Sequence, residues 1–309
     1  MRERFETNVS QWDALGEGRA GRAAAAWGSL STLAEEQAGQ LCESLRLLLD
    51  PTLATRLQGD YKTGKRINIR KIIPYIASQF RKDKIWLRRT KPSKRQYHVM
   101  VAIDNSRSMA DTSARAMACE AMATICTAMA KLEVGDIGVC SFGSSVELLH
   151  PFGQPFTADA GARVLSQFSF DQESTRLVET LHQLIGVLDD AKQHVRETSL
   201  SRGKCMQIVF MISDGILGGS DRERVRGAVL TAASRNQLLA LLIIGNPESS
   251  NSILATKQLV YDSKGNMAGF KSYMEDYPFP WFVLVRDVRS LPQALSDCLR
   301  QWFEAINTK

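Results

Sequence analysis

Oxygen-bearing side chains gather at three points in the sequence where an apolar segment ends. The first point is Asp104-Asn105-Ser106-Arg107-Ser108, a D-x-S-x-S pattern that follows the short apolar run 97–103. If Asp104 ends a strand and both serines fall in the turn that opens the next helix, one carboxylate and two hydroxyls can face a common point. Such hard oxygen donors suit Mg²⁺ or Mn²⁺. Magnesium usually keeps several waters, which leaves room for an incoming carboxylate.

Two later residues add oxygen donors of the same kind. Thr175, in Gln-Glu-Ser-Thr, immediately precedes an amphipathic segment and could supply another hydroxyl. Asp214, in Ile-Ser-Asp-Gly, follows a strongly apolar run and could bind a metal directly or hold a metal-bound water. Ligands of open α/β sheets bind beyond the carboxyl ends of the strands, so we expect these donors to meet at one edge. The alternative is that the hydroxyls merely cap helices and the aspartates merely end strands.

Apolar strands alternate with amphipathic helices from residue 97 onward, which predicts an α/β fold with a doubly wound, mostly parallel sheet. The expected strands are 97–103, 136–142, 205–212, 238–244 and 281–285, with a short edge strand at 146–149. The expected helices are 109–132, 175–195, 221–235 and 292–306. Four methionines of the first helical region are predicted to fill the core: Met109, Met117, Met122 and Met129.

The chain divides into three parts. Residues 1–60 are expected to form a helical extension or the end of a linker, with one or two helices ending near Asp50. Residues 61–96 form a basic segment packed on, or leading into, a domain at 97–309. Between 62 and 95 there are 13 Lys and Arg and one acid, Asp83, whereas the remainder has 26 basic and 32 acidic residues. The basic segment could bind RNA, serve as a nuclear localisation signal, or pack through its apolar residues Ile67, Ile69, Ile72, Ile73 and Trp86.

A long connection of low periodicity lies at 246–280, and such loops are usually functional or disordered. Its lysines and aromatic residues are typical of a protein interface, and the candidates for partner contact are Lys257, Tyr261, Lys264, Phe270, Lys271 and Tyr273. Arg107, inside the metal loop, is a further candidate, or else a plain surface arginine. A disordered surface insertion is the alternative for the loop.

Several classes of function are disfavoured. No apolar run reaches the ~18–20 residues of a membrane span, and we expect no membrane partner. The six cysteines are scattered without metal-site spacing, which favours reduced core thiols in an intracellular protein. The segment from Gly59 to Arg66 nearly matches a phosphate-binding loop, but arginine stands where a serine or threonine is needed. No G-x-S-x-G motif supports a hydrolase. If the oxygen donors form a site for metal-dependent protein binding, the chain itself is not expected to be an enzyme.

The order of the three motifs resembles the von Willebrand factor A family, whose metal-ion-dependent adhesion site is built from three such loops. The resemblance implies a Rossmann-like fold and metal ligation by Asp104, Ser106, Ser108, Thr175 and Asp214. Mg²⁺ is the implied ion, with Mn²⁺ or Ca²⁺ as alternatives. The glycine that usually precedes the threonine in this family is absent here, where Ser174 stands.

The stretch from Gly59 to Met109, which begins GDYKTGKRINIRKIIPYIASQF, is similar to the midasin family, the dynein-related AAA+ ATPases of ribosome biogenesis. This resemblance runs from about Gln58 to the C-terminus. It implies a nuclear domain, nucleolar and nucleoplasmic, that captures ubiquitin-like domains of pre-60S assembly factors. A partner carboxylate would complete the metal shell, and an AAA+ ring in the same polypeptide, with ATP sites outside this chain, would then remove the factor. The alternatives are an RNA-binding module that uses 62–95, and a metal-chelatase or other adhesion-type subunit, against which the basic segment argues.

Overall fold

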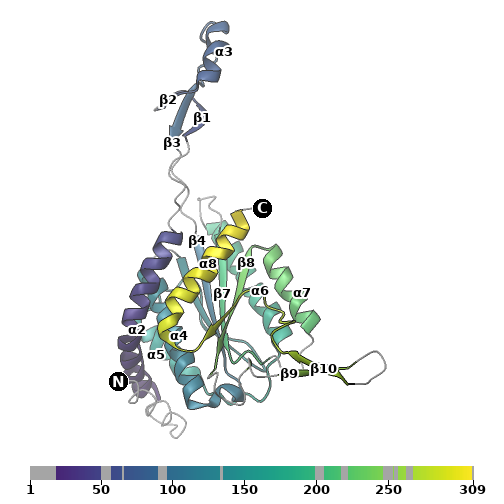
Figure 1. Ribbon diagram of the computed structural model, residues 1–309. Helices are drawn as coiled ribbons and strands as arrows, with labels where there is room; N and C mark the ends of the chain where they lie inside the picture. The colour runs from purple at the N-terminus through teal and green to yellow at the C-terminus, as the bar shows by residue number, and fades with distance from the viewer. Residues whose placement is uncertain are drawn as a thin grey trace.

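A six-stranded sheet forms the centre of the computed structural model (Figure 1). The structure describes residues 19–49, 57–64, 66–89, 96–132, 135–198, 205–216, 222–245, 253, 257–261 and 267–307. The strands are ordered β11-β8-β7-β4-β5-β6, and β6 alone among these six runs antiparallel to its neighbour. Their bounds are β4 Gln96–Asp104, β5 Gly135–Phe142, β6 Glu147–His150, β7 Cys205–Ser213, β8 Gln237–Ile244 and β11 Phe282–Val285. The predicted doubly wound, mostly parallel sheet is confirmed.

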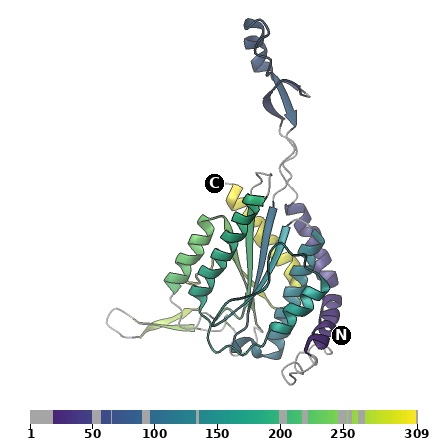
Figure 2. The same ribbon diagram turned by 180° about the vertical axis from the view of Figure 1, so that it is seen from behind.

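Helices cover both faces of this sheet (Figures 1 and 2). One face packs against α2 (Arg19–Leu49), α4 (Thr112–Leu132), α5 (Ala158–Gln167) and α8 (Leu291–Asn307), and the other against α6 (Leu177–Thr198) and α7 (Arg222–Ser234). Alternate residues of β4 serve the two cores, with Val99 and Val101 in the first and Met100 and Ala102 in the second. The four predicted core methionines are buried. No helix in the described part of the chain could span a bilayer.

The first helix, α2, belongs to the same core as the sheet. Its buried side chains include Trp27, Leu30, Leu41 and Leu45, and they join the cluster formed by α4, α5 and α8. Small residues permit the close approach: a Cβ added at Gly161 of α5 would lie 2.2 Å from the Trp27 ring. The helix ends at Leu49, close to the predicted end at Asp50. The predicted domain boundary at residue 97 left this helix outside, and its burial brings residues 19–49 into the folded unit.

A small sheet with one short helix stands at the end of the molecule where the central strands begin (Figure 1). We call residues 57–64 and 66–89 the basic appendage. It comprises β1 (Leu57–Tyr61), β2 (Arg66–Ile67), η2 (Ile69–Lys71), α3 (Ile72–Ala77) and β3 (Trp86–Arg89), with antiparallel strand order β1-β3-β2. Packing against the domain was one of the alternatives for this segment, but Ile67, Ile69 and Ile73 are exposed.

The connection at 246–280 contains regular structure that its sequence did not reveal. Strand β9 (Lys257–Tyr261) pairs antiparallel with β10 (Met267–Ser272), and this hairpin projects from the end of the molecule where the central strands finish (Figures 1 and 2). The single long loop predicted at 246–280 is therefore corrected to a connection that contains a β-hairpin.

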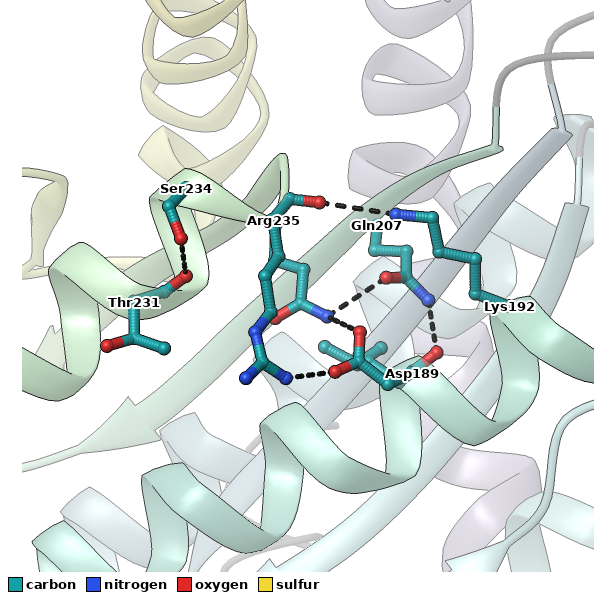
Figure 3. A network of polar contacts seen from close by, with 8 residues as sticks. Asp189, Lys192, Gln207, Thr231, Ser234 and Arg235 are labelled. Atoms are coloured by element: carbon teal, nitrogen blue, oxygen red, sulfur yellow. Dashed lines mark hydrogen bonds and ion pairs between the residues drawn. The ribbon is translucent and has the colours of Figure 1, made fainter.

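A row of polar residues crosses the sheet near the amino ends of its strands. His98 of β4 lies beside Gln207 of β7, which lies beside Gln237 of β8. Gln237 Nε2 donates to Gln207 Oε1 at 3.1 Å and to Asp189 Oδ1 of α6 at 3.1 Å. Arg235, in the turn between α7 and β8, forms an ion pair with Asp189 (Figure 3). This polar row fixes α6 and the α7–β8 turn to the sheet.

Candidate metal centre

The first candidate loop folds back on the end of β4. Asp104 is 2% exposed and its Oδ1 accepts a hydrogen bond from the Ser106 N–H at 2.9 Å. The hydroxyl oxygens of Ser106 and Ser108 lie 3.0 Å apart. Ser106 is buried and Ser108 is exposed, so the pair leads from the buried carboxylate to the surface. The 3₁₀ helix η3 (Arg107–Ala110) then turns the chain into α4.

The second carboxylate reaches the same place from the neighbouring strand β7. Ser213 Oγ lies 2.7 Å from Asp104 Oδ2 and 3.4 Å from Asp214 Oδ1, and it therefore links the two acids. Asp214 Oδ1 also accepts from the Ile216 N–H at 2.9 Å. Gly215 has φ +80°, a conformation that glycine adopts without strain, and its carbonyl accepts from the Tyr277 hydroxyl at 2.9 Å. Ser213 was not among the predicted site residues, although its position before Asp214 was visible in the sequence.

Asn105 and Gln172 tie the loop that contains Thr175 to the D-x-S-x-S loop. Asn105 Oδ1 accepts from the N–H groups of Ser169 at 3.1 Å and Phe170 at 2.6 Å. Arg107 N–H donates to the Gln172 carbonyl at 2.8 Å, and Gln172 Oε1 accepts from the Ser144 N–H at 2.7 Å. Sequence reasoning missed both residues because an isolated Asn or Gln carries no periodic or spacing signal.

Thr175 precedes α6, as the sequence predicted, and is half-buried. It lines a small, mostly apolar pocket together with Ser213, Gly215 and Ile216. The five predicted donors therefore gather at the carboxyl ends of β4 and β7. Asp104, Ser106 and Ser108 form one connected group, Asp214 joins it through Ser213, and Thr175 lines the same pocket as Ser213.

The electrostatics of this cluster fit a cation. Burial raises the pKa of Asp104, hydrogen bonds from Ser106 and Ser213 act in the opposite direction, and the charge of Asp214 raises it further. The hydrogen bonds described for the two carboxylates come from backbone N–H groups and a serine hydroxyl rather than from Lys or Arg. Two neighbouring acids with serine and threonine hydroxyls form a donor set that suits Mg²⁺ or Mn²⁺. Among the described residues, no group of three or more His, Cys, Asp and Glu provides a softer site.

The predicted partner-contact residues lie in different elements of the structure. Arg107 is exposed beside the serines. The strands of the β9–β10 hairpin contain Lys257, Tyr261, Phe270 and Lys271. Lys264 lies outside the described residues. Tyr273 is 7% exposed, and the Arg222 guanidinium lies 4.4 Å from the centre of its ring. A buried ring supports the turn after β10, so the prediction that Tyr273 contacts a partner needs correction.

Comparisons with known proteins agree with this geometry. Residues 99–216 match the von Willebrand factor type A domain family. This part of the chain is a von Willebrand factor type A domain. The matched residues contain Asp104, Ser106, Ser108, Thr175 and Asp214. Von Willebrand A domains are generally binding modules rather than catalytic ones.

Two curated relatives extend the similarity beyond the von Willebrand A domain. The chain is 44% identical over 278 residues to midasin from Dictyostelium discoideum, a match that covers 90% of this chain and 5% of that protein. It is 36% identical over 271 residues to midasin from Giardia intestinalis, with 86% and 5% covered. The chain thus spans about a twentieth of the length of these relatives. The resemblance to the midasin family that the sequence indicated is confirmed.

Two solved structures are similar at lower identity. A von Willebrand factor type A protein from Catenulispora acidiphila is 12% identical, with a TM-score of 0.43, and the match covers 67% of this chain and 43% of that one. The manganese-loaded TRAP protein of Plasmodium vivax is 15% identical, with a TM-score of 0.35, and the match covers 48% of this chain and 57% of that one.

Proposed function

We propose that this von Willebrand A domain binds a partner protein through a divalent metal ion, most naturally Mg²⁺, with Mn²⁺ or Ca²⁺ as alternatives. Asp104, Ser106, Ser108, Thr175 and Asp214 would hold the ion, directly or through water. The observation that carries the proposal is the convergence of two acids and three hydroxyls at one edge of the sheet. When bound, the ion supplies an open coordination position for an oxygen donor from outside the domain.

Other residues around the metal centre orient its ligands, hold its loops and provide contacts to a partner. Burial and the bonds from Ser106 and Ser213 fix the orientation of Asp104 before any ligand arrives, so little ordering is needed on binding. Asn105 and Gln172 hold the loops that carry the hydroxyls. A carboxylate alone gives little specificity, and the exposed Arg107 and the β9–β10 hairpin lie where they could contact the body of a partner.

The similarity to midasin supports a more specific proposal for the partner. We infer that it is a ubiquitin-like domain of a pre-60S ribosome assembly factor, which supplies a Glu or Asp to the ion. An AAA+ ATPase ring in the same polypeptide would then pull the factor from the particle in the nucleus. In this proposal the domain binds the assembly factor and does not catalyse a reaction.

The test is binding of the chain to such a ubiquitin-like domain, measured by isothermal titration calorimetry with Mg²⁺ and with EDTA. Asp104→Ala should abolish binding in Mg²⁺ to the level seen in EDTA. Asp190→Ala is the matched control, because Asp190 is an exposed acid on α6, and it should bind as the unmodified chain does. A separate Mg²⁺ titration without the partner distinguishes loss of the ion from loss of the partner. Binding that is indifferent to both EDTA and Asp104→Ala would refute metal-bridged capture.

A further inference from the structure

The basic appendage exposes apolar side chains that a folded protein normally covers. Ile69 and Ile73 are 79% and 77% exposed, and Phe80 is 62% exposed. Ile67 and Ile76, at 41% and 57%, extend the same group. Single exposed apolar residues need no explanation, but five of them between residues 67 and 80 of one small unit indicate an interaction surface.

The appendage cannot bury these residues by itself. Its strands have five, two and four residues, and its helix α3 has six. Among the appendage residues whose burial is described, one apolar side chain is buried, that of Ile85, which is 7% exposed. A unit this small has little core of its own, and it stands clear of the helices that cover the central sheet (Figures 1 and 2).

The exposed face is nevertheless held in a defined shape. Asn68 accepts from the Arg70 N–H at 3.2 Å and donates its own N–H to the Ile85 carbonyl at 2.7 Å. After α3 the chain turns through Gln79 and Phe80, with φ values of +53° and +65°, a conformation that is unfavourable for side chains other than glycine. Phe80 N–H donates to the Tyr75 carbonyl at 3.0 Å, and the two rings meet edge to face at 5.1 Å. This strained turn keeps the side chain of Phe80 at the surface, and strained backbone of this kind often occurs at binding sites.

The charge of the appendage defines the chemistry of a matching surface. Its sequence has nine Lys and Arg against two Asp, Asp60 and Asp83. Asp83 is already paired with Lys62 at 3.0 Å, while Arg66, Arg70 and Lys82 are exposed in the same segment as the isoleucines. A nucleic acid would meet the positive charges but would leave aliphatic side chains in water. A membrane-surface element is normally a long amphipathic helix, and α3 has six residues.

We propose that the basic appendage is a docking surface for a second protein, whose matching surface is apolar and bordered by Asp and Glu. The appendage and the metal centre lie at opposite ends of the sheet, because β4 leaves the appendage side and ends at Asp104 (Figure 1). The domain can therefore hold two proteins at once, one by each end. This proposal is independent of the metal-dependent function and survives if that function fails.

The test uses a fluorescein-labelled helical peptide that carries leucine on one face and glutamate on the others. A scrambled peptide of the same composition, without a leucine face, is the reference. Fluorescence anisotropy with the whole chain should show the ordered peptide binding about tenfold more tightly than the scrambled one. The triple variant Ile69→Ser, Ile73→Ser, Ile76→Ser should remove that tenfold preference, and Arg70→Glu with Lys82→Glu should weaken binding of the ordered peptide by a similar factor.

The control is Leu148→Ser with Leu230→Ser, which alters exposed apolar residues at 47% and 63% exposure on the main domain, and it should leave binding unchanged. Equal binding of both peptides, or a triple variant that binds as before, would overturn the proposal. So would tighter binding of single-stranded oligouridine RNA or of phosphatidylserine vesicles than of the ordered peptide. Limited proteolysis that cuts the appendage no faster in the variants than in the unmodified chain shows that the appendage remains folded.

Discussion

Asn105 has no charge, and its side chain contributes to the metal centre by accepting hydrogen bonds from backbone N–H groups of another loop. It is 3% exposed, and its Oδ1 accepts two N–H groups from the segment that leads to Thr175. The D-x-S-x-S pattern treats this position as variable, yet in the structure it links two of the three loops. The geometry of the metal centre therefore depends on the residues that position the loops as well as on the ligands themselves.

Asn105→Ala should destabilise the chain by about 1–3 kcal/mol, because the buried N–H of Phe170 and the partly buried N–H of Ser169 lose their acceptor. The midpoint of urea denaturation measures this loss, and Mg²⁺ affinity should fall with it. Ser169→Ala, in the same segment, removes a hydroxyl that donates to Asp171 and should change stability by less than ~0.5 kcal/mol. Equal effects of the two substitutions would mean that the Asn105 amide does not hold the loops together.

The sequence identified the five donors because each is marked by its residue type and by its place at the end of an apolar run. Ser213, Asn105 and Gln172 lack such marks, and their roles depend on contacts between segments far apart in the chain. Tyr273 shows the opposite error: an aromatic residue in an aperiodic segment was expected at the surface and is buried. Residue type predicts chemistry well and burial within irregular segments poorly.

At the scale of elements, α2 closes one face of the sheet through contacts between small and large residues. Trp27 lies over Gly161, where the ring takes the space that any Cβ would occupy. Ring edge contacts also join Trp27 to Phe156, at 5.8 Å between centroids. The sequence predicted one or two helices in this region, but complementarity between a tryptophan and a glycine about 130 residues apart cannot be read from a single sequence.

Gly161→Ala should cost about 1–3 kcal/mol of stability, because the added methyl overlaps the Trp27 ring. Gly186→Ala is the matched control: it lies within α6, and nothing lies within 4 Å of its added Cβ. This control should stabilise the chain by roughly 0.5–1 kcal/mol, since alanine favours the helix interior. Thermal denaturation of both variants measures the difference, and two stabilised variants would show that α2 does not pack closely on α5.

The polar row near the amino ends of the strands makes stability depend on pH. His98 is 1% exposed, and burial lowers its pKa below the ordinary 6.5, despite the opposing effect of Asp136 and with a smaller lowering from Lys192. The ring centroids of His98 and Phe152 lie 5.0 Å apart. The Nδ1 atom of His98 lies 3.7 Å from Cys205 Sγ and 3.3 Å from Gln207 Nε2. The unfolded chain therefore binds a proton more readily than the folded chain does.

The stabilising effect of neutral His98 is fully present above pH 6.5 and is lost as the pH falls below it, by at most about 1.4 kcal/mol per pH unit. Urea denaturation at pH 7.5 and 5.5 should show a drop that His98→Gln reduces. His182→Gln alters an exposed histidine on α6 and should leave the drop unchanged. A pH dependence that is the same in all three proteins would exclude His98 as its source.

At the scale of the whole molecule, the two ends of the sheet carry separate features. The metal centre and the β9–β10 hairpin lie at one end, and the basic appendage lies at the other (Figures 1 and 2). The alternation of strands and helices predicted the sheet and therefore the edge where the donors meet. It could not predict the appendage's isolation, because the exposed isoleucines have the same sequence signature as core residues.

Replacing residues 57–89 by a flexible Gly/Ser linker should leave the domain folded and its Mg²⁺ affinity unchanged within about twofold. The reason is that the appendage contributes no side chain to either of the two described core clusters. Calorimetric Mg²⁺ titration and thermal denaturation check this result. A fall in Mg²⁺ affinity of tenfold or more would show that the two ends are coupled.

Strand β4 is the element that joins these two ends, and this has a mechanical consequence. It enters from the appendage, pairs along its length with β5 and β7 on either side, and finishes at Asp104. A force applied between a protein held at the metal centre and one held at the appendage would run along β4. Both ladders of hydrogen bonds would then be loaded in shear, all together, rather than opened one by one. The sheet would thus transmit tension between the two proposed partners without first coming apart.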